Sequence, residues 1–164
     1  MGVERAEHRL FLPDLAATRT LAGRVAARLA PGSVVLLEGD LGAGKSEFAR
    51  ALIRSRAGAP ITVPSPTFTL LQSYALPALE VAHADLYRLG DESEAQELGL
   101  EECWRHGALL VEWPARAPSL WPEERLEVTL AQVRADAGAR QAVLIGTGRW
   151  AGELAGLARG FATF

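Results

Sequence analysis

The sequence predicts an α/β fold with a parallel sheet core, antiparallel strands at its flanks and helices on both faces. Three observations predict it. Apolar segments of strand length alternate with amphipathic segments of helix length. Two of these segments, 33-SVVLLEG-39 and 108-ALLVEW-113, are continuously apolar, as is typical of strands covered on both faces. Two later strand segments, 125-RLEVTL-130 and 141-QAVLIG-146, favour added antiparallel strands.

The first part of the chain predicts a strand, a helix and a second strand. Residues 8-HRLFL-12 have strand character, and Asp14 is placed to cap the helix that follows. Pro31 and Gly32 end this helix before the apolar strand 33–39 begins. The apolar face of the helix repeats at i, i+4 spacing and consists of Leu21, Val25 and Leu29.

A second helix, a stiff loop and a hairpin are predicted next. The helix spans about 44–57 and ends at Gly58. Residues 59-APITVPSPTF-68 contain three prolines, which exclude both a regular helix and a central strand. The segments 69-TLLQSY-74 and 79-LEVAHA-84 then predict two paired strands.

The remaining elements are a helix, the strands already named and a second, short helix. Residues 91-DESE-94 resemble a capping box, which opens an acidic helix that continues to about Trp104. The buried strand 108–113 follows, and a proline-rich loop separates it from the last two strands. A short helix is expected from about Trp150.

Composition limits the class of protein. The 164 residues predict a single domain over 1–164, and 49% hydrophobic with 23% charged residues is a soluble globular composition. No apolar run is long enough to span a bilayer, and the charged N-terminus does not resemble a signal peptide, so we expect a cytoplasmic protein. One cysteine, Cys103, fits a reducing compartment. A net charge of −3 argues against independent binding of DNA or RNA.

A glycine-rich motif predicts a phosphate-binding loop (P-loop). The pattern G-x-x-x-x-G-K-[ST] is met at residues 39–46, between an apolar strand and an amphipathic helix, which is the context that supports it. Such a loop directs backbone N–H groups and a helix N-terminus at phosphate oxygens. The fold class is therefore P-loop NTPase-like. The residues expected to surround the phosphates are Asp40, Leu41, Gly42, Ala43, Gly44, Lys45, Ser46 and Glu47.

Lys45 is the only lysine, so sixteen of the seventeen basic Lys and Arg residues are arginines. A lysine in this motif reaches the β- and γ-phosphates, and the following hydroxyl, here that of Ser46, binds Mg²⁺. An ammonium is compact whereas a guanidinium is a wide planar fork, so a tight loop favours lysine at this position.

Two carboxylates are candidate partners of the P-loop. Glu112 ends the strand 108–113, where a carboxylate would bind Mg²⁺ or polarise the attacking water. Asp85, in 83-HADLYR-88, also ends a strand. The alternative for each is a solvated or ion-paired carboxylate with no role in catalysis.

Other candidates are less specific. Thr67 lies in the proline-braced loop, where many P-loop switches carry a threonine that senses Mg²⁺ and the γ-phosphate; a turn threonine is the alternative. His83 is interpreted as a core histidine or a residue that supports the site, and Trp113 either lies against the nucleotide or covers the core. The chain has no asparagine, so the N-K-x-D element of guanine-specific GTPases is absent, which favours ATP.

Four motifs in this order resemble the TsaE (YjeE) family of bacterial ATPases. They are 39-GDLGAGKS-46, 65-SPTFTL-70, 83-HADLYRL-89 and 110-LVEWP-114, and the resemblance covers about residues 10 to 130. It implies a weak Mg²⁺-dependent ATPase that acts with TsaD and TsaB. These partners modify the adenosine beside the tRNA anticodon to threonylcarbamoyladenosine, so tRNA is contacted only through the complex.

The resemblance also implies roles by position. Gly42, Gly44 and Lys45 would hold phosphates, and Ser46 would bind Mg²⁺. Asp85 and Glu112 would be the acidic pair around Mg²⁺ and the attacking water, without a decision on which is the direct ligand. Thr67 would take a switch-like position and contribute to catalysis with Lys45 and the acidic pair, and Trp113 would lie near the nucleotide.

Two other functions compete with this prediction. A small-molecule P-loop kinase has similar size, but it needs an arginine-rich lid, for which Arg116 and Arg125 are the nearest candidates. A nucleotide-dependent docking module, in which hydrolysis is incidental, is the third.

Overall fold

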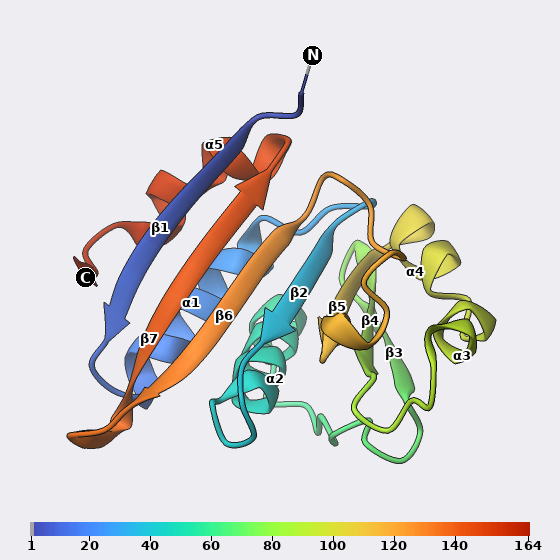
Figure 1. Cartoon of the computed structure of the whole chain (residues 1–164), viewed down its shortest axis with the longest axis horizontal. Coiled ribbons are helices and arrows are strands. Elements are labelled where there is room, and N and C mark those ends of the chain that lie inside the picture. The colour runs from blue at the N-terminus through green and yellow to red at the C-terminus, as the bar shows by residue number, and fades with distance from the viewer. Residues whose placement is uncertain (1) are drawn as a thin grey trace.

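The computed structural model describes residues 2–164, which form one eight-stranded sheet with helices packed against it (Figure 1). The strands are β1 (Arg5–Leu12), β2 (Val34–Glu38), β3 (Leu71–Leu76), β4 (Leu79–Asp85), β5 (Ala108–Glu112), β6 (Leu126–Val133), β7 (Asp136–Thr147) and β8 (Ala162–Thr163). The helices are α1 (Leu15–Ala27), α2 (Lys45–Ala57), α3 (Glu92–Glu97), α4 (Leu100–His106) and α5 (Arg149–Ala158), with the 3₁₀ turn η1 (Pro114–Arg116).

The sheet order is β3-β4-β5-β2-β6-β7-β1-β8. The four central strands β4, β5, β2 and β6 are parallel, and β3 at one side and β7, β1 and β8 at the other are antiparallel to their neighbours. The predicted fold class, a parallel core flanked by antiparallel strands, is confirmed, and so is the predicted hairpin of β3 and β4.

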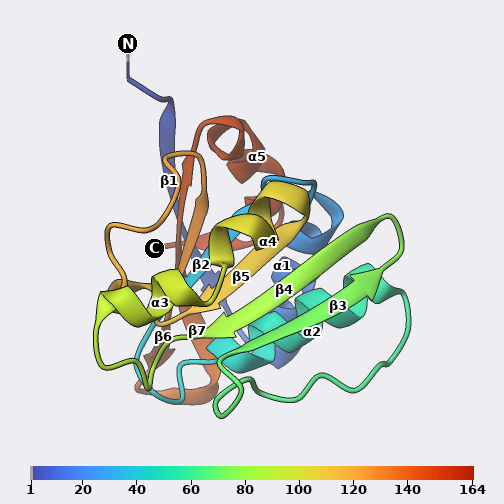
Figure 2. The same ribbon diagram turned by 90° about the vertical axis from the view of Figure 1, so that its right-hand side faces the viewer.

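Helices cover both faces of the parallel core. Helix α2 packs on one face of the core through a hydrophobic cluster that includes Leu37 and Leu110, and α1 and α5 extend this layer over β7 and β1. Helices α3 and α4 pack on the other face over Leu36 and Val111. Figure 2 shows α2 and α4 on opposite sides of β4. Because alternate residues of β2 and β5 face the two clusters, both strands need a continuously apolar sequence.

Local sequence signals account for the start of α1 and the end of α2. The Asp14 side chain accepts a hydrogen bond of 2.8 Å from the N–H of Ala17 and caps α1, as predicted. Helix α2 ends at Gly58, which adopts a left-handed conformation with φ of 66°.

The predicted helix from Asp91 to Trp104 is wrong in one respect, because two helices, α3 and α4, occupy this segment. Asp91 caps α3 by accepting a bond of 2.8 Å from the N–H of Ser93. Gly99 then adopts φ of 72°, which interrupts the helical path between α3 and α4. The break could not be predicted from the acidic residues, because acidic side chains stabilise the first turn of a helix and are present in the first turns of both α3 and α4.

The parallel strands bring three loops to one edge of the sheet. The carboxyl ends of β2, β4 and β5 lie side by side, so the loops after Glu38, Asp85 and Glu112 meet there. Crevices at such ends are the usual ligand sites of open α/β sheets. Within residues 2–164, no helix has the length and apolar character needed to cross a membrane.

Candidate functional site

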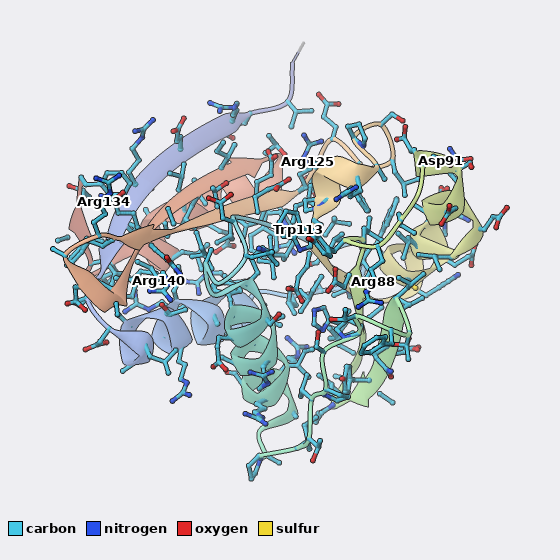
Figure 3. The ribbon with its side chains drawn as sticks, turned by 60° about the horizontal axis from the view of Figure 1, so that its bottom comes forward. Arg88, Asp91, Trp113, Arg125, Arg134 and Arg140 are labelled. Atoms are coloured by element: carbon cyan, nitrogen blue, oxygen red, sulfur yellow. The ribbon has the colours of Figure 1, made fainter. Side chains whose placement is uncertain are left out.

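A cleft of about 430 Å³ lies at this edge of the sheet. The P-loop and the first turn of α2 form one side, and Thr67, the segment from Asp85 to Arg88 and the pair Glu112–Trp113 form the other. Figure 3 shows Trp113 between Arg140, which comes from β7, and Arg88, which follows β4.

The P-loop requires its glycines. Gly39, Gly42 and Gly44 have positive φ angles of 146°, 82° and 108°. A Cβ atom on Gly39 would lie 2.4 Å from the carbonyl oxygen of Leu130 in β6, so the loop passes directly against the sheet. Because α2 begins at Lys45, the N–H groups of its first turn have no helical partner and are available to an anion.

Lys45 is 5% exposed and lines the cleft. Its Nζ donates to the carbonyl oxygen of Asp40 at 2.9 Å and also to that of Gly39. The same atom lies 4.2 Å from the centre of the Trp113 ring, which fits a cation–π contact. Burial lowers the pKa of Lys45, and the charges of Glu112 and the neighbouring carboxylates oppose that shift. Lys45 therefore lies close to several carboxylates, which favour its charged form.

Glu112 is held from two sides. Its Oε1 accepts a bond of 2.9 Å from Ser46 Oγ in the first turn of α2, and its Oε2 lies 2.7 Å from Nε2 of His83. His83 and Glu112 are 1% and 2% exposed. Nδ1 of His83 is buried without a partner among the described residues, so the tautomer with its proton on Nε2 fits best. His83 therefore fixes the carboxylate, in agreement with its interpretation as a supporting residue.

Asp85 lies beside Glu112, because the two residues are paired in the register of β4 and β5. Its Oδ1 accepts from the N–H of Tyr87 at 3.0 Å, and its Oδ2 accepts from Oγ1 of Thr67 at 3.4 Å. Burial raises the pKa of Asp85; the Tyr87 N–H opposes the shift, and the charge of Glu112 adds to it. Two carboxylates and two hydroxyls thus converge at one end of the cleft.

An aromatic pair forms the rim opposite the P-loop. The rings of Trp113 and Tyr87 are 4.8 Å apart, and the guanidinium of Arg116 lies 5.6 Å from the Tyr87 ring. Trp113 has φ of 60° and ψ of 47°, a left-handed conformation that is costly for a bulky side chain. The strand therefore ends at Glu112 and not at Trp113, and the turn directs the indole toward Lys45.

These donors suit Mg²⁺. It prefers oxygen ligands, keeps several waters, and is held in nucleotide sites by one or two protein groups together with phosphates. Ser46 Oγ and the carboxylates of Glu112 and Asp85 supply such ligands. Among residues 2–164 no group of three or more His, Cys, Asp or Glu forms a metal cluster, which such a site does not require.

The structure brings most of the predicted site residues together at one place. Thr67, Asp85, Glu112 and Trp113 line the cleft with six P-loop residues, Leu41, Gly42, Gly44, Lys45, Ser46 and Glu47, of which Leu41 is 68% exposed. Asp40 and Ala43 do not line the cleft and lie instead in a neighbouring hollow against β6. The two arginines considered for a kinase lid are not brought together: Arg116 lies over Tyr87, whereas Arg125 pairs with Glu127 at the start of β6.

Sequence reasoning missed two residues that contact the P-loop. Arg140 and Gln132, from the β6–β7 hairpin, donate to the carbonyl oxygens of Gly42 and Ala43. No motif contains either residue, and both lie beyond the region that the family resemblance covers. Both residues lie between the predicted strand segments 125–130 and 141–146, and they join the sheet only because β6 and β7 extend to Val133 and from Asp136.

Known proteins resemble this chain over most of its length. The family model described as "Threonylcarbamoyl adenosine biosynthesis protein TsaE" matches residues 12–142. The tRNA threonylcarbamoyladenosine biosynthesis protein TsaE of Rickettsia bellii is 43% identical over 113 residues, which are 69% of this chain and 78% of that protein. The protein of the same name from Bacillus subtilis is 40% identical over 120 residues, 73% of this chain and 74% of its own length.

A solved structure has the same fold. The crystal structure of YdiB from Bacillus subtilis superposes with a TM-score of 0.76 and 30% sequence identity, and the match covers 97% of each chain. The family match, the sequence relatives and this structure agree with the four motifs that line the cleft. The chain therefore belongs to the TsaE family of nucleotide-binding tRNA threonylcarbamoyladenosine biosynthesis proteins.

Proposed function

We propose that this protein binds ATP with Mg²⁺ in the cleft and hydrolyses it as a cytoplasmic component of the tRNA threonylcarbamoyladenosine machinery, acting with TsaD and TsaB. The whole chain acts as one P-loop ATPase domain. The observation that carries the proposal is the bond of 2.9 Å between Ser46 Oγ and Glu112, which joins the P-loop helix to an acidic strand end beside Asp85.

The P-loop would hold the phosphates. Free N–H groups at the start of α2 and the ammonium of Lys45 supply positive charge where the β- and γ-phosphates lie in such loops. The Lys45 side chain is already buried and is held by two carbonyl oxygens and the Trp113 ring. Nucleotide binding would therefore cost little side-chain conformational entropy at this residue. The rim ring of Trp113 would cover the nucleotide next to Lys45.

Ser46 and Glu112 would hold the metal, and Asp85 with Thr67 would position the attacking water. When bound, Mg²⁺ neutralises the charge that develops on the phosphate oxygens. Glu112 is assigned to the metal because it contacts Ser46, whose position in the motif is that of a metal ligand. Asp85 is assigned to the water because its second oxygen contacts the loop threonine.

The tRNA would be contacted through the partner proteins. The chain carries a net charge of −3, whereas independent RNA binding relies on a positive surface. Membership of a biosynthetic pathway implies other components, and TsaD and TsaB are the partners that we propose.

The test is ATP hydrolysis by the purified protein, alone and with TsaD and TsaB. Weak activity alone, a clear rise with both partners and loss of activity in Lys45→Ala are expected. Arg54→Ala is a matched control, since it removes a cation from the far part of α2. A wild-type protein whose activity does not rise with correctly assembled partners would contradict the proposal.

A further inference from the structure

We propose that Gln132 and Arg140 form a carbonyl clamp that orients the P-loop for phosphate binding. The clamp consists of these two side chains and the carbonyl oxygens of Gly42 and Ala43. The inference rests on the proposed function of the cleft and assigns two positioning residues to it. Both come from the β6–β7 hairpin, to which no motif in the sequence assigns a role.

The clamp closes on the loop from one side. Nε of Arg140 donates to the Ala43 oxygen at 2.8 Å, and its Nη2 donates to the Gly42 oxygen at 3.3 Å. Nε2 of Gln132 donates to the same Gly42 oxygen at 2.9 Å. The two residues are direct cross-strand partners in the register of β6 and β7, so their side chains share one face of the hairpin.

Peptide geometry connects these contacts to the phosphates. In a trans peptide the C=O of one residue and the N–H of the next point in opposite directions. A fixed Ala43 carbonyl therefore directs the N–H of Gly44 away from Arg140. The preceding peptide, between Gly42 and Ala43, is held at both ends, because its carbonyl accepts from the clamp and its N–H donates to the carbonyl oxygen of Asp40 at 3.0 Å. Gly44 lies at the N-terminus of α2, where N–H groups bind phosphate.

A glycine-rich loop needs such an external restraint. Gly42 and Gly44 lack the Cβ atoms that limit backbone rotation, so isolated peptides at these positions adopt many orientations. A loop that must be ordered when the ligand arrives binds it more weakly than one ordered in advance. The clamp residues restrain the loop backbone from the side of the β6–β7 hairpin, so they do not occupy the side of the loop that would face the phosphates.

The remaining contacts of Arg140 distinguish a frame from a mobile catalytic arginine. Its Nη1 donates to the carbonyl oxygens of Ala137 and Ala139, each at 2.7 Å. Together with the carbonyl oxygens of Ala43 and Gly42, the guanidinium thus contacts four carbonyl oxygens. Because a guanidinium has only five N–H donors, few donors remain for a ligand. Although Arg140 lines the cleft, these contacts tie it to its own hairpin and to the loop.

The experiment measures the affinity of the full chain for ATP and for inorganic tripolyphosphate, both with Mg²⁺, by calorimetry. Gln132→Leu should weaken both ligands by about 5-fold and Arg140→Gln by about 10-fold or more, because one and two clamp bonds are lost. Equal factors for the two ligands are expected, since the clamp acts on the phosphates and not on the base. Arg24→Gln is the control, because Arg24 also donates to two backbone carbonyls, those of Leu157 and Arg159, but outside the cleft.

A second readout does not depend on a ligand. Amide hydrogen exchange of the segment 39–46 should accelerate in both clamp variants and stay at the wild-type rate in Arg24→Gln. Arg140→Lys keeps the charge but cannot bridge four carbonyls, so it should resemble Arg140→Gln.

Three outcomes overturn the proposal. If folded Gln132→Leu and Arg140→Gln bind both ligands like the wild type, the clamp is refuted while the ATP site stands. If Arg140→Lys restores affinity and Gln132→Leu has no effect, Arg140 acts by its charge and not as a clamp. If the wild-type protein binds neither ligand, the proposed function fails and the clamp fails with it.

Discussion

The two halves of the sheet differ in how they are covered. In the parallel half, β2 and β5 are apolar along their length because helices cover both faces. In the antiparallel half, β7 alternates: Ala142 and Leu144 are buried toward the helices, whereas Val143 and Ile145 are half-buried on the face without a helix. The strands of the parallel half end at Asp85 and Glu112, the carboxylates of the cleft. The β6–β7 hairpin, on the side of the antiparallel half, contacts the P-loop that faces these carboxylates. Chemistry and support thus come from differently built regions that meet at β6.

The largest expected effect concerns the acidic strand end of the parallel half. Glu112→Gln keeps the size of the side chain and removes its charge. Hydrolysis should fall by about 100-fold or more, in the range seen when one group that stabilises charge in the transition state is removed. ATP binding should change by less than about 10-fold, because the P-loop remains. Hydrolysis and calorimetry on the same preparation measure the two effects.

This variant also separates two functions. If Glu112→Gln supports full threonylcarbamoyladenosine formation with the partner proteins, hydrolysis is incidental and the protein is a nucleotide-dependent docking module. The matched control is Glu127→Gln in β6, which removes a half-buried carboxylate that does not line the cleft.

The contact of the P-loop with β6, the strand at which the two halves meet, predicts the next effect, on stability. In Gly39→Ala the new methyl group would lie 2.4 Å from the Leu130 oxygen and 2.9 Å from Cβ of Ala43, at a φ of 146°. The free energy of unfolding should drop by about 3 kcal/mol, from overpacking and backbone strain together. Gly58→Ala is the control: its φ is 66° and nothing lies within 4 Å, so a loss of about 1 kcal/mol is expected. Equal losses in a urea titration would contradict the close contact at Gly39.

Support within the parallel half gives a smaller effect. His83→Leu leaves one oxygen of Glu112 buried without its partner, and kcat should fall by about 10-fold, as expected for the loss of one hydrogen bond to a charged group. KM for ATP should change little, because the histidine does not line the cleft. His83→Gln retains a donor and should recover part of kcat. A variant that loses stability but keeps its kcat would assign His83 to the core alone.

The smallest expected effect is on the pH dependence of stability and concerns Glu38, the last residue of β2. Burial raises the pKa of Glu38; the backbone of Ala115 and the charge of Lys45 oppose this shift, and Glu127 adds to it. The folded chain therefore binds this proton more tightly than the unfolded chain does. Stability falls as pH rises through the folded-state pKa, and the full cost is present above it.

Glu38→Gln should thus raise the urea midpoint modestly at pH 7.5 and leave it unchanged at about pH 3.5, where the carboxyl is protonated in both states. Exposed Glu123→Gln is the control and should change the midpoint little at either pH. A larger gain at the acidic pH would reverse the assigned direction of the shift.

The sequence was more informative about the parallel half for physical reasons. The proposed chemistry restricts residue type there: a phosphate site would need Gly44 and Lys45, and a metal would need a hydroxyl and a carboxylate, so a motif forms that can be recognised. The continuous apolar runs likewise predicted β2 and β5. Asp85 and Glu112 were expected at the site because each ends a predicted strand, and Thr67 because it lies in the proline-braced loop. The structure places all three at the cleft.

The antiparallel half and the helix break were harder to predict. A side chain that donates to a backbone carbonyl can be Gln, Arg or another donor, so the contacts of Gln132 and Arg140 left no pattern. The register that makes them neighbours depends on the bulge after Gln132, which is a property of the folded sheet. The break at Gly99 depends on a single left-handed residue within a segment of good helix formers.

The central claim is that the carboxyl edge of the parallel strands is a Mg²⁺-dependent ATP site built around Lys45. Calorimetric titration of ATP into the wild-type protein, with Mg²⁺ and with EDTA, and into Lys45→Ala tests it directly. We predict saturable binding by the wild type that weakens by at least about 10-fold in EDTA or in the variant, since each removes a positive charge from the phosphates. Equal affinity in all three titrations would contradict the claim.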